Sequence, residues 1–383
     1  MNRRVGIVSM GYHGFSAVTP DLSYRELVYL AASKAYAAAG IEPQHVDMFI
    51  CAAEDFCEGY SISDEYCNDQ LGAVKKPVQT VCGEYLQAIG NACMLIQSGL
   101  GKLVVVEAHS KASNMKTHDD VLSFGMDPIW NRPLKVTPHF VAGLDMHRYL
   151  LDTGTTEEQC AAIVVKNKAN AMLNPSAAHA GRFTVADVLR AETVAWPVNR
   201  LSIAPRADGC IVTVLAEESL ARQLNSSPVW ITGTGWATET TALETRRWGS
   251  APSAEIASQM AYKEAGITVP SQQIDLFEVD DSYAYRELQA LEALKVFGKG
   301  QALHALDEGR LGPTGDCPVN VSGGSLGVGH LLEATGAQKL LELFLQLSFK
   351  AGERQLPDVT TGLAQAWRGV PTTTSAVVIC SNE

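Results

Sequence analysis

The chain has 383 residues, of which 46% are hydrophobic and 19% charged, with a formal net charge of −12 and a pI near 5.3. This composition is that of a well-buried globular protein of about two domains, not of a disordered chain. The negative charge argues against nucleic acid or an anionic membrane surface as the main partner. No run reaches the roughly 18 apolar residues of a membrane span. The basic start at Asn2–Arg4 leads into a strand-like run, not into a signal peptide.

Nine cysteines are spread along the chain, and no two of them form a CxxC pair. This usage is typical of reduced thiols in the cytoplasm, where most cysteines fill the core. Cys51, Cys57 and Cys67 lie close in sequence, but their spacing matches no common zinc-binding pattern. We therefore predict a cytoplasmic protein with no metal ion in this chain.

Two series of predicted elements follow one another in the same order. Each consists of a strand, a helix closed by a glycine, a second strand, a β-rich run that leads into another helix, and a buried strand. In the first half these segments are 5–11, 35–40, 46–49, 77–82 and 102–106. In the second half they are 229–235, 261–266, 274–277, 318–322 and 376–379. The shared order indicates a duplicated α/β unit.

The alternation of strands and helices predicts two layered α/β units with largely parallel central strands. We place the N-terminal half at 1–225 and the C-terminal half at 226–383. Between 113 and about 190 the first half carries an insertion, rich in Asp, His, Asn and Pro, that the second half lacks. An insertion of this length in a compact domain is typically a lid or a binding loop.

Ligands bind beyond the carboxyl ends of the strands in an open parallel sheet, so the two equivalent strand-to-helix junctions are the predicted site. Cys82 follows a strand and opens a helix, whose N-terminus favours a thiolate; a buried structural cysteine is the alternative. The second junction, 320–330, gathers four glycines around His330. A core histidine or a phosphate loop is the alternative there, although the GxxxxGK[ST] order is absent. Together, Cys82 and His330 would form a Cys–His pair for acyl transfer.

These segments resemble the thiolase family. The segment 81–89 resembles the nucleophile segment VCASGLQAI, and 318–336 resembles the N-x-S-G-G…G-H-P-x-x-A-T-G block. The segment 278–284 resembles E-L-H-D-A-F-A of sterol-carrier-protein-type and archaeal thiolases. The resemblance covers nearly the whole chain and implies an α/β thiolase fold, with duplicated halves in an α-β-α-β-α arrangement.

The resemblance also implies roles for the matching residues. Cys82 would take the acyl group, with its backbone N–H in an oxyanion hole. His330 would deprotonate Cys82 and polarise the thioester carbonyl. Asp280 stands where the family places His or Asn, and it is the third catalytic residue that we predict, although a carboxylate there would repel an oxyanion unless it is protonated or turned away. The proline that follows the histidine in the family is Leu331 here.

Coenzyme A, as a substrate, would contact the glycine-rich junction and cations near the insertion. At the junction we predict contacts from Gly329, Gly324 and Ser322. For the phosphates we predict Lys111 and Arg132, with Lys116 and Lys135 as further candidates, and solvated surface as the alternative for each. Trp130 and Tyr283 could line an acyl pocket, although core packing explains them equally well.

The loop that carries a second, acid/base cysteine in the family reads Ala366–Pro371 here and contains no cysteine. Cleavage of a 3-oxoacyl chain requires an acid for the departing carbanion. His139, His147, Asp280 or a water could serve, and the sequence does not choose among them. Cys317 starts a predicted strand and is interpreted as structural.

The resemblance implies CoA-dependent cleavage or formation of a 3-oxoacyl-CoA, with a branched or aromatic substrate such as benzoylsuccinyl-CoA. One alternative is retro-aldol cleavage of a hydroxyacyl-CoA, which needs no acyl-enzyme. Another is a catalytically degenerate thiolase-fold scaffold subunit. This branch of the family further implies a homodimer and a small DUF35-type zinc-ribbon partner.

Overall fold

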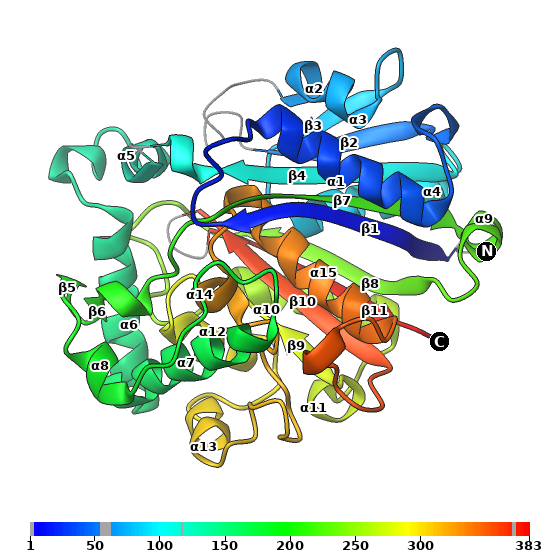
Figure 1. Cartoon of the computed structure of the whole chain (residues 1–383). Coiled ribbons are helices and arrows are strands. Elements are labelled where there is room, and N and C mark those ends of the chain that lie inside the picture. The colour runs from blue at the N-terminus through cyan, green and yellow to red at the C-terminus, as the bar shows by residue number, and fades with distance from the viewer. Residues whose placement is uncertain (1–3, 54–62, 116–117, 370–372) are drawn as a thin grey trace.

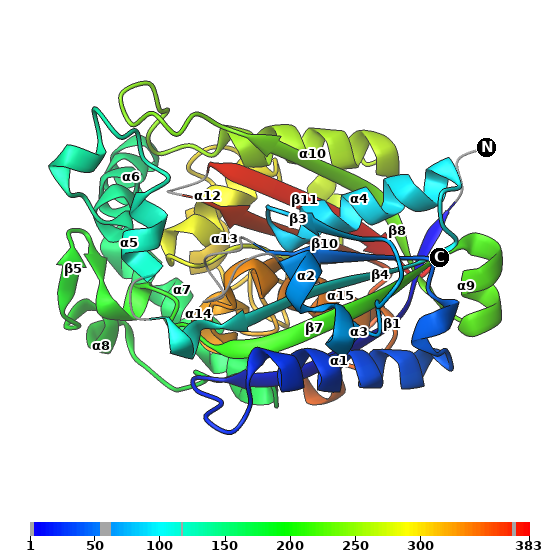
Figure 2. The same ribbon diagram turned by 90° about the horizontal axis from the view of Figure 1, so that it is seen from above.

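The computed structural model describes residues 4–53, 63–115, 118–369 and 373–383. Figure 1 shows the N-terminal strands above the C-terminal strands, with the segment between β4 (Leu103–Lys111) and β7 (Asp208–Glu217) at the left end. The view from above in Figure 2 places the same segment at the end opposite to both termini. Within these described ranges, no helix has both the length and the apolar character that crossing a bilayer requires.

One nine-stranded sheet runs through both halves, in the order β3-β2-β4-β7-β1-β8-β11-β10-β9. Besides β4 and β7, its strands are β1 (Val5–Ser16), β2 (Met48–Ala52), β3 (Val78–Val81), β8 (Val229–Thr238), β9 (Leu276–Glu278), β10 (Thr361–Arg368) and β11 (Thr374–Ser381). β1 and β8 pair only over Val5–Ile7 and Val229–Ile231, which makes a narrow joint. Outward from this joint, β1-β7-β4-β2-β3 is mirrored by β8-β11-β10-β9, and Val319 bridges to Phe277 where β3 would have its counterpart.

Strand direction differs in part from the prediction. β2 is parallel to β3 and β4, and β9 is parallel to β10. β7 is antiparallel to β1 and β4, and β11 is antiparallel to β8 and β10. The expectation of largely parallel central strands is therefore wrong near the joint. These antiparallel strands are covered on both faces, so their sequences show the continuous apolar runs that are typical of parallel strands.

Helices α4 (Tyr85–Ser98) and α15 (Thr335–Leu347) lie in a core shared by both halves. The core contains Leu86 and Leu340 from the two helices. It also contains Val106 and Val378 from the strands of the two halves. Because neighbouring strand residues face opposite sides, Val105 points instead toward the outer core of the N-terminal half. The central layer is thus helical, with strands on each side of it.

Outer helices complete the predicted α-β-α-β-α order. α1 (Tyr24–Ala39) covers the N-terminal strands, whereas α10 (Pro252–Ala265) and α12 (Tyr285–Ala293) cover the C-terminal strands. α1 and α10 both end at a left-handed glycine, Gly40 with φ 64° and Gly266 with φ 71°, as the sequence predicts. The shorter helices of the two halves are α2 (Ser63–Tyr66), α3 (Asn68–Leu71), α9 (Glu218–Leu224), α11 (Pro270–Gln273), α13 (Ala302–Asp307) and α14 (Gly324–Val328).

The insertion joins the end of β4 to the start of β7. Its elements are α5 (His118–Ser123), α6 (Pro138–Thr153), α7 (Glu157–Asn170), α8 (Val185–Leu189), β5 (Thr193–Ala195) and β6 (Val198–Asn199). β5 and β6 pair only with each other, so the added material continues past 190 to about 207. In the mirrored order β4 corresponds to β10 and β7 to β11, so the predicted equivalence of 102–106 with 376–379 is wrong. The equivalent link, between β10 and β11, spans only 369–373. α7 packs Ile163 and Val164 into the outer core of that half.

Two glycines at equivalent positions of the halves bring an outer helix onto a strand. A Cβ added to Gly11 on β1 would lie 2.1 Å from Ala31 O of α1. A Cβ added to Gly235 on β8 would lie 2.1 Å from Ala257 O of α10. Both obstacles are helix backbone atoms, which cannot move without shifting the whole helix. The close approach is therefore a shared feature of both copies.

We expect Gly11→Ala and Gly235→Ala each to destabilise the protein by about 1–3 kcal/mol, because overpacking a rigid contact forces backbone shifts. Chemical denaturation of each variant measures the change. Gly298→Ala is the matched control, since its added Cβ would meet nothing closer than 3.4 Å. Equal midpoints for all three variants would contradict the packing argument.

Candidate active site

Cys82 lies in the turn between β3 and α4, with an exposed side chain. The helix begins at Tyr85, and Glu84 is its N-cap, with Oε2 accepting a hydrogen bond from Leu86 N at 2.6 Å. Glu84, and not Cys82, therefore caps the helix N-terminus, which corrects the expectation that Cys82 opens the helix.

A guanidinium lies beside the sulfur, since Arg368 Nη2 is 3.9 Å from Cys82 Sγ. Arg368 ends β10, in the segment where the resemblance places an acid/base cysteine. Its Nε lies 3.8 Å from Oε1 of the buried Glu333, which holds the guanidinium near the sulfur. A fixed cation at this distance favours the thiolate, the form of cysteine that attacks a thioester.

A cavity of about 370 Å³ lies where the insertion meets the C-terminal half. Its wall includes Arg368, His330 and Tyr283 from the C-terminal half and His139 from α6. Arg368 links the two residues of the predicted pair, because it lines the cavity with His330 and contacts Cys82. Cys82 itself is not part of this wall; Arg368 connects it to the cavity that His330 lines.

His330 follows the glycine-rich turn. Gly329 has φ 117°, and a Cβ there would lie 2.5 Å from Ala207 Cβ, so this position requires glycine. The His330 backbone donates to Pro205 O at 2.7 Å and accepts from Ala207 N at 3.0 Å. On the ring, Nδ1 accepts a hydrogen bond from Leu332 N at 3.2 Å, so neutral His330 carries its proton on Nε2. This tautomer suits polarisation of a carbonyl, whereas removal of the Cys82 proton at Nε2 would need the opposite tautomer.

Asp280 is fully buried and does not line the cavity. Its Oδ1 accepts hydrogen bonds from Ser282 N at 2.9 Å and from Ser282 Oγ at 2.6 Å. Burial opposes the charged form, but Arg286 and Lys339 outweigh it and lower the pKa of Asp280. Asp280 is thus a charged carboxylate turned away from the cavity, which corrects its prediction as a catalytic residue and as a proton donor.

The glycine-rich junction is closed by the protein's own carboxylates. Asp281 accepts hydrogen bonds from Ser325 N at 2.6 Å and Leu326 N at 3.1 Å in the first turn of α14. A Cβ at Gly324 would lie 2.2 Å from Asp281 Oδ2. Ser322 Oγ donates to Glu278 Oε2 at 2.7 Å. Both Gly324 and Ser322 are buried away from the cavity, which corrects their prediction as cofactor contacts; Gly329 acts by positioning His330.

Of the predicted phosphate contacts, Lys111 is buried and paired with groups inside the protein. Its Nζ lies 2.8 Å from Asp208 Oδ2 and 2.6 Å from Thr19 Oγ1, and the side chain is buried. Its prediction as a CoA contact is therefore corrected. Arg132 and Lys135 are exposed on the insertion, and Arg132 Nε donates to Met126 O at 3.0 Å. Lys116 lies outside the described residues.

Among the predicted proton donors, His139 lines the cavity, whereas His147 packs against Trp196 with ring centroids 4.8 Å apart. Tyr283 also lines the cavity, in agreement with the predicted acyl pocket, but Trp130 is 71% exposed and lies outside its wall. Cys317 is buried, and burial raises the pKa of its thiol to about 12, as a structural cysteine requires.

Residues 235–382 match a family model described as "Thiolase C-terminal domain-like". Over 94% of its length the chain is 29% identical to an acetyl-CoA acetyltransferase of Methanothermobacter thermautotrophicus, covering 95% of that protein. Residues 235–382 thus carry a thiolase C-terminal domain-like match, and the chain as a whole is similar to acetyl-CoA acetyltransferases. It is also 29% identical, over 50% of each chain, to the benzoylsuccinyl-CoA thiolase subunit BbsB of Thauera aromatica.

Solved structures share the fold of this chain. The "Ltp2-ChsH2(DUF35) aldolase" superposes with a TM-score of 0.84 at 21% identity, covering 99% of this chain and 98% of the other. Human mitochondrial 3-ketoacyl-CoA thiolase in complex with CoA superposes with a TM-score of 0.74 at 17% identity, again covering 99% and 98%. The predicted thiolase fold is thereby confirmed.

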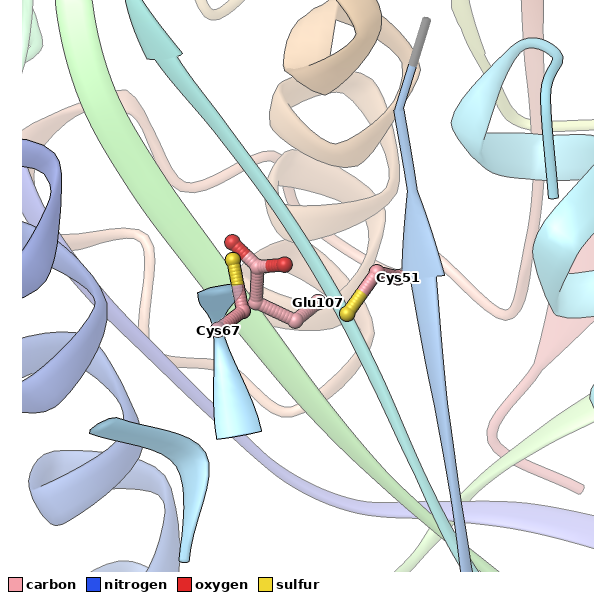
Figure 3. Close-up of side chains that lie close together, drawn as sticks. All are labelled: Cys51, Cys67 and Glu107. Carbon is pink, nitrogen blue, oxygen red and sulfur yellow. The ribbon is translucent and has the colours of Figure 1, made fainter. Parts of the chain in front are cut away.

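Away from the cavity, the chain buries a cluster of sulfur and carboxylate groups. Ligand atoms of Cys51, Cys67 and Glu107 lie within 4.8 Å of one another, and among the described residues this is the group that could hold a metal ion. Figure 3 shows Glu107 lying between the two cysteines. His109 Nδ1 lies 2.6 Å and Cys210 Sγ 3.6 Å from Glu107 Oε1. We interpret the cluster as thiol and imidazole donors around a buried carboxylate.

The Glu107–His109 pair generates a pH dependence of stability. Burial opposes the charged imidazole, but the charge and hydrogen bond of Glu107 outweigh it and raise the pKa of His109 to about 9. Because the folded-state pKa is raised, the pair stabilises the protein fully at pH values below the unfolded pKa, near 6.5. This stabilisation is lost as the pH rises through 9. We expect the free energy of unfolding to fall by on the order of 3 kcal/mol across this range. Denaturation midpoints from pH 6 to 9.5 measure it, and Glu107→Gln/His109→Asn should remove this part of the slope; an unchanged slope would contradict the pairing.

Sequence reasoning missed Arg368 and Glu84 as parts of the site. The signal for Arg368 was the segment Ala366–Pro371, which contains this arginine and no cysteine. Glu84 stands where the family motif has serine. Only the fold places it as the α4 cap and in the cavity wall.

We expect Arg368→Gln to slow alkylation of Cys82 by iodoacetamide at pH 7 about 10-fold, because each tenfold loss of thiolate slows the reaction in proportion. Peptide mass spectrometry measures the modified fraction over time. Arg222→Gln removes an exposed arginine paired with Glu218 on α9 and is the control. Equal rates in both variants would show that Arg368 does not stabilise the thiolate.

Proposed function

We propose that this chain is an acyl-CoA acyltransferase that cleaves or forms a 3-oxoacyl-CoA through an acyl group on Cys82. The observation that carries the proposal is the contact of Arg368 with Cys82 Sγ at the wall of a cavity that also contains His330. This arrangement offers a stabilised thiolate and an N–H donor to one thioester. The acetyl-CoA acetyltransferase similarity over 94% of the chain supports the reaction class.

The proposed roles follow from these contacts. Cys82, with the guanidinium of Arg368 beside it, attacks the thioester or ketone carbonyl as a thiolate. His330 donates from Nε2 to the developing oxyanion, because its Nδ1 is occupied by Leu332 N. Collapse of the intermediate leaves the acyl group on Cys82 and releases the leaving group. CoA, or the carbanion of a second acyl-CoA, then takes the acyl group from Cys82. We also propose that the chain divides into an N-terminal half at 1–225 and a C-terminal half at 226–383, and that each half contributes residues to this site.

For the substrate, we propose a branched or aromatic acyl-CoA of the benzoylsuccinyl-CoA kind. Trp367, Tyr283 and Leu122 in the cavity wall offer apolar surface for such a group. The similarity to a benzoylsuccinyl-CoA thiolase subunit supports it. Arg132, exposed on the insertion, and Arg200, in the cavity wall, are the proposed contacts of the CoA phosphates.

For assembly, we propose a cytoplasmic homodimer that binds a small DUF35-type zinc-ribbon subunit. β3 is a sheet edge with all four residues half-buried, which suits pairing with a second copy. Exposed apolar side chains gather on the insertion, which suits a second partner; they are Phe124, Ile129, Trp130 and Leu134. The similar fold of a DUF35-associated aldolase supports the zinc-ribbon proposal. The described cysteines are free thiols, in keeping with a cytoplasmic location.

Retro-aldol cleavage of a hydroxyacyl-CoA is the second candidate, favoured by the loop without a cysteine and by the fold shared with an aldolase. It uses no acyl-enzyme, so it gives no role to the contact between Arg368 and Cys82. A catalytically degenerate scaffold subunit would likewise need neither residue. For this reason we place acyl transfer first.

We expect acetyl-, propionyl-, benzoyl- or succinyl-CoA to add its acyl mass to the Cys82 peptide, and Cys82→Ala to lose the adduct and at least about 10³-fold of CoA-dependent cleavage. Peptide mapping and thioester absorbance measure the two effects. Cys93→Ala, at a buried cysteine of α4, is the control. Activity that survives Cys82→Ala would favour retro-aldol cleavage, and absence of turnover with and without a zinc-ribbon subunit would favour a scaffold.

A further inference from the structure

We propose that Tyr283, held by His139 and Asp119, is the acid that protonates the carbanion released from a 3-oxoacyl-CoA, in place of the missing loop cysteine. This inference rests on the proposed function and adds the group that the acyl-enzyme mechanism lacks. Tyr283 is the proton donor, while His139 and Asp119 act through it.

The three side chains form a continuous chain of contacts. His139 Nδ1 lies 2.8 Å from the hydroxyl oxygen of Tyr283, and its Nε2 lies 3.4 Å from Asp119 Oδ2. Arg206 Nη2 lies 2.6 Å from Asp119 Oδ1 and holds the carboxylate from the other side. A nucleophile or acid, an imidazole and a carboxylate in this order are the parts of a proton relay.

The donation that we propose requires a proton on both nitrogens of His139. Nε2–H then faces Asp119, and Nδ1–H donates to the Tyr283 oxygen at 2.8 Å, which leaves the phenolic proton free to point toward the substrate. The Asp119 carboxylate, 3.4 Å from Nε2, balances the charge of this imidazolium. The relay therefore runs from Asp119 through His139 to the phenol, and the phenolic group is its end toward the substrate.

All four residues line the same cavity as His330 and Arg368. Asp119 and His139 come from α5 and α6 of the insertion, whereas Tyr283 comes from the C-terminal half just before α12. The relay is assembled only because the insertion folds over that half. This gives the insertion, which the second half lacks, a chemical role as well as a covering one.

The surroundings of Tyr283 keep it protonated. Burial raises the pKa of the phenol, Arg286 opposes this rise, and the Asp119 and Asp280 carboxylates add to it. A phenol with a raised pKa is uncharged at neutral pH, but the rise makes it a weaker acid, so its proton transfer depends on the contact with His139. Glu84, which also lines the cavity, is the competing acid because burial raises its pKa to about 8; its Oε2 accepts the Leu86 N–H at 2.6 Å as the cap of α4.

In the cleavage direction the step balances as follows. Attack by the Cys82 thiolate on the 3-oxo carbon breaks the bond between the α-carbon and that carbon, and the electron pair goes to the α-carbon. The α-carbon takes the proton of the Tyr283 hydroxyl. The tyrosinate then takes a proton from the protonated His139, whose charge Asp119 balances, and His139 regains it from the thiol of the incoming CoA. Bond formation uses the same steps in reverse.

The test separates protonation at carbon from acylation at sulfur. Acetyl-CoA or propionyl-CoA is incubated with the protein in D₂O; peptide mass spectrometry follows the Cys82 adduct, and proton NMR follows deuterium entering the α-position. We expect Tyr283→Phe still to form the adduct, since the phenyl ring keeps the apolar surface, but to lose α-exchange about 10²- to 10⁴-fold. Tyr29→Phe, at a tyrosine 59% exposed on α1, is the matched control.

Two further variants test the positioning residues without removing the phenol. His139→Gly should lose α-exchange and regain part of it with imidazole in the buffer, and Asp119→Glu should retain more exchange than Asp119→Asn. Tyr283→Phe with unchanged exchange, or His139→Gly without imidazole rescue, would overturn the relay. Failure of the unmodified protein to acylate Cys82 with any acyl-CoA would instead contradict the proposed function.

Discussion

The packing of α4 against α15 is the constraint on which the arrangement of the site depends. Both helices lie in the core shared by the two halves, and at their first turns Glu84 meets Gly336 so closely that a Cβ on Gly336 would lie 1.9 Å from Glu84 Oε1. Because the turn of Cys82 precedes one helix and the turn of His330 precedes the other, this contact brings both junctions to one end of the sheet. The duplication therefore supplies the site geometry, and the side chains on it decide the chemistry.

Buried charges explain why many residues of the family motifs do not touch the cavity. Asp281 takes the backbone N–H groups at the start of α14, and Glu278 takes Ser322, so a turn that is shaped to bind an anion already holds one. Lys111 and Asp208 neutralise each other between β4 and β7. These groups are paired as buried charges must be, and they fix the turn that presents His330.

The sequence predicts the fold well because its evidence is local and repeated. A glycine that ends each outer helix, and an apolar strand after it, recur in both halves, and α1, α10, β2 and β9 appear where these signals lie. Cys82 and His330 could be named because they stand at equivalent turns. Asp280, Ser322 and Gly324 could not be assigned correctly, since their partners, Arg286, Glu278 and Asp281, are defined only by burial in three dimensions. The prediction of strand direction near the joint was wrong because an apolar run indicates that both faces of a strand are covered but does not indicate its direction.

The segment Ala366–Pro371 at the end of β10 contains an arginine and no cysteine, so in the proposed mechanism two groups share the tasks that a second thiol would combine. A guanidinium is always charged, so Arg368 can stabilise the Cys82 thiolate but can neither give nor take a proton. The proton must then come from a different wall of the cavity, and the insertion places an imidazole between a carboxylate and a phenol there. Because Arg368 cannot act as an acid, the proposed mechanism needs the insertion to supply the groups that support proton transfer. In the proposed mechanism, the absence of a loop cysteine therefore goes with a division of roles between Arg368, which stabilises the thiolate, and Tyr283, which gives the proton.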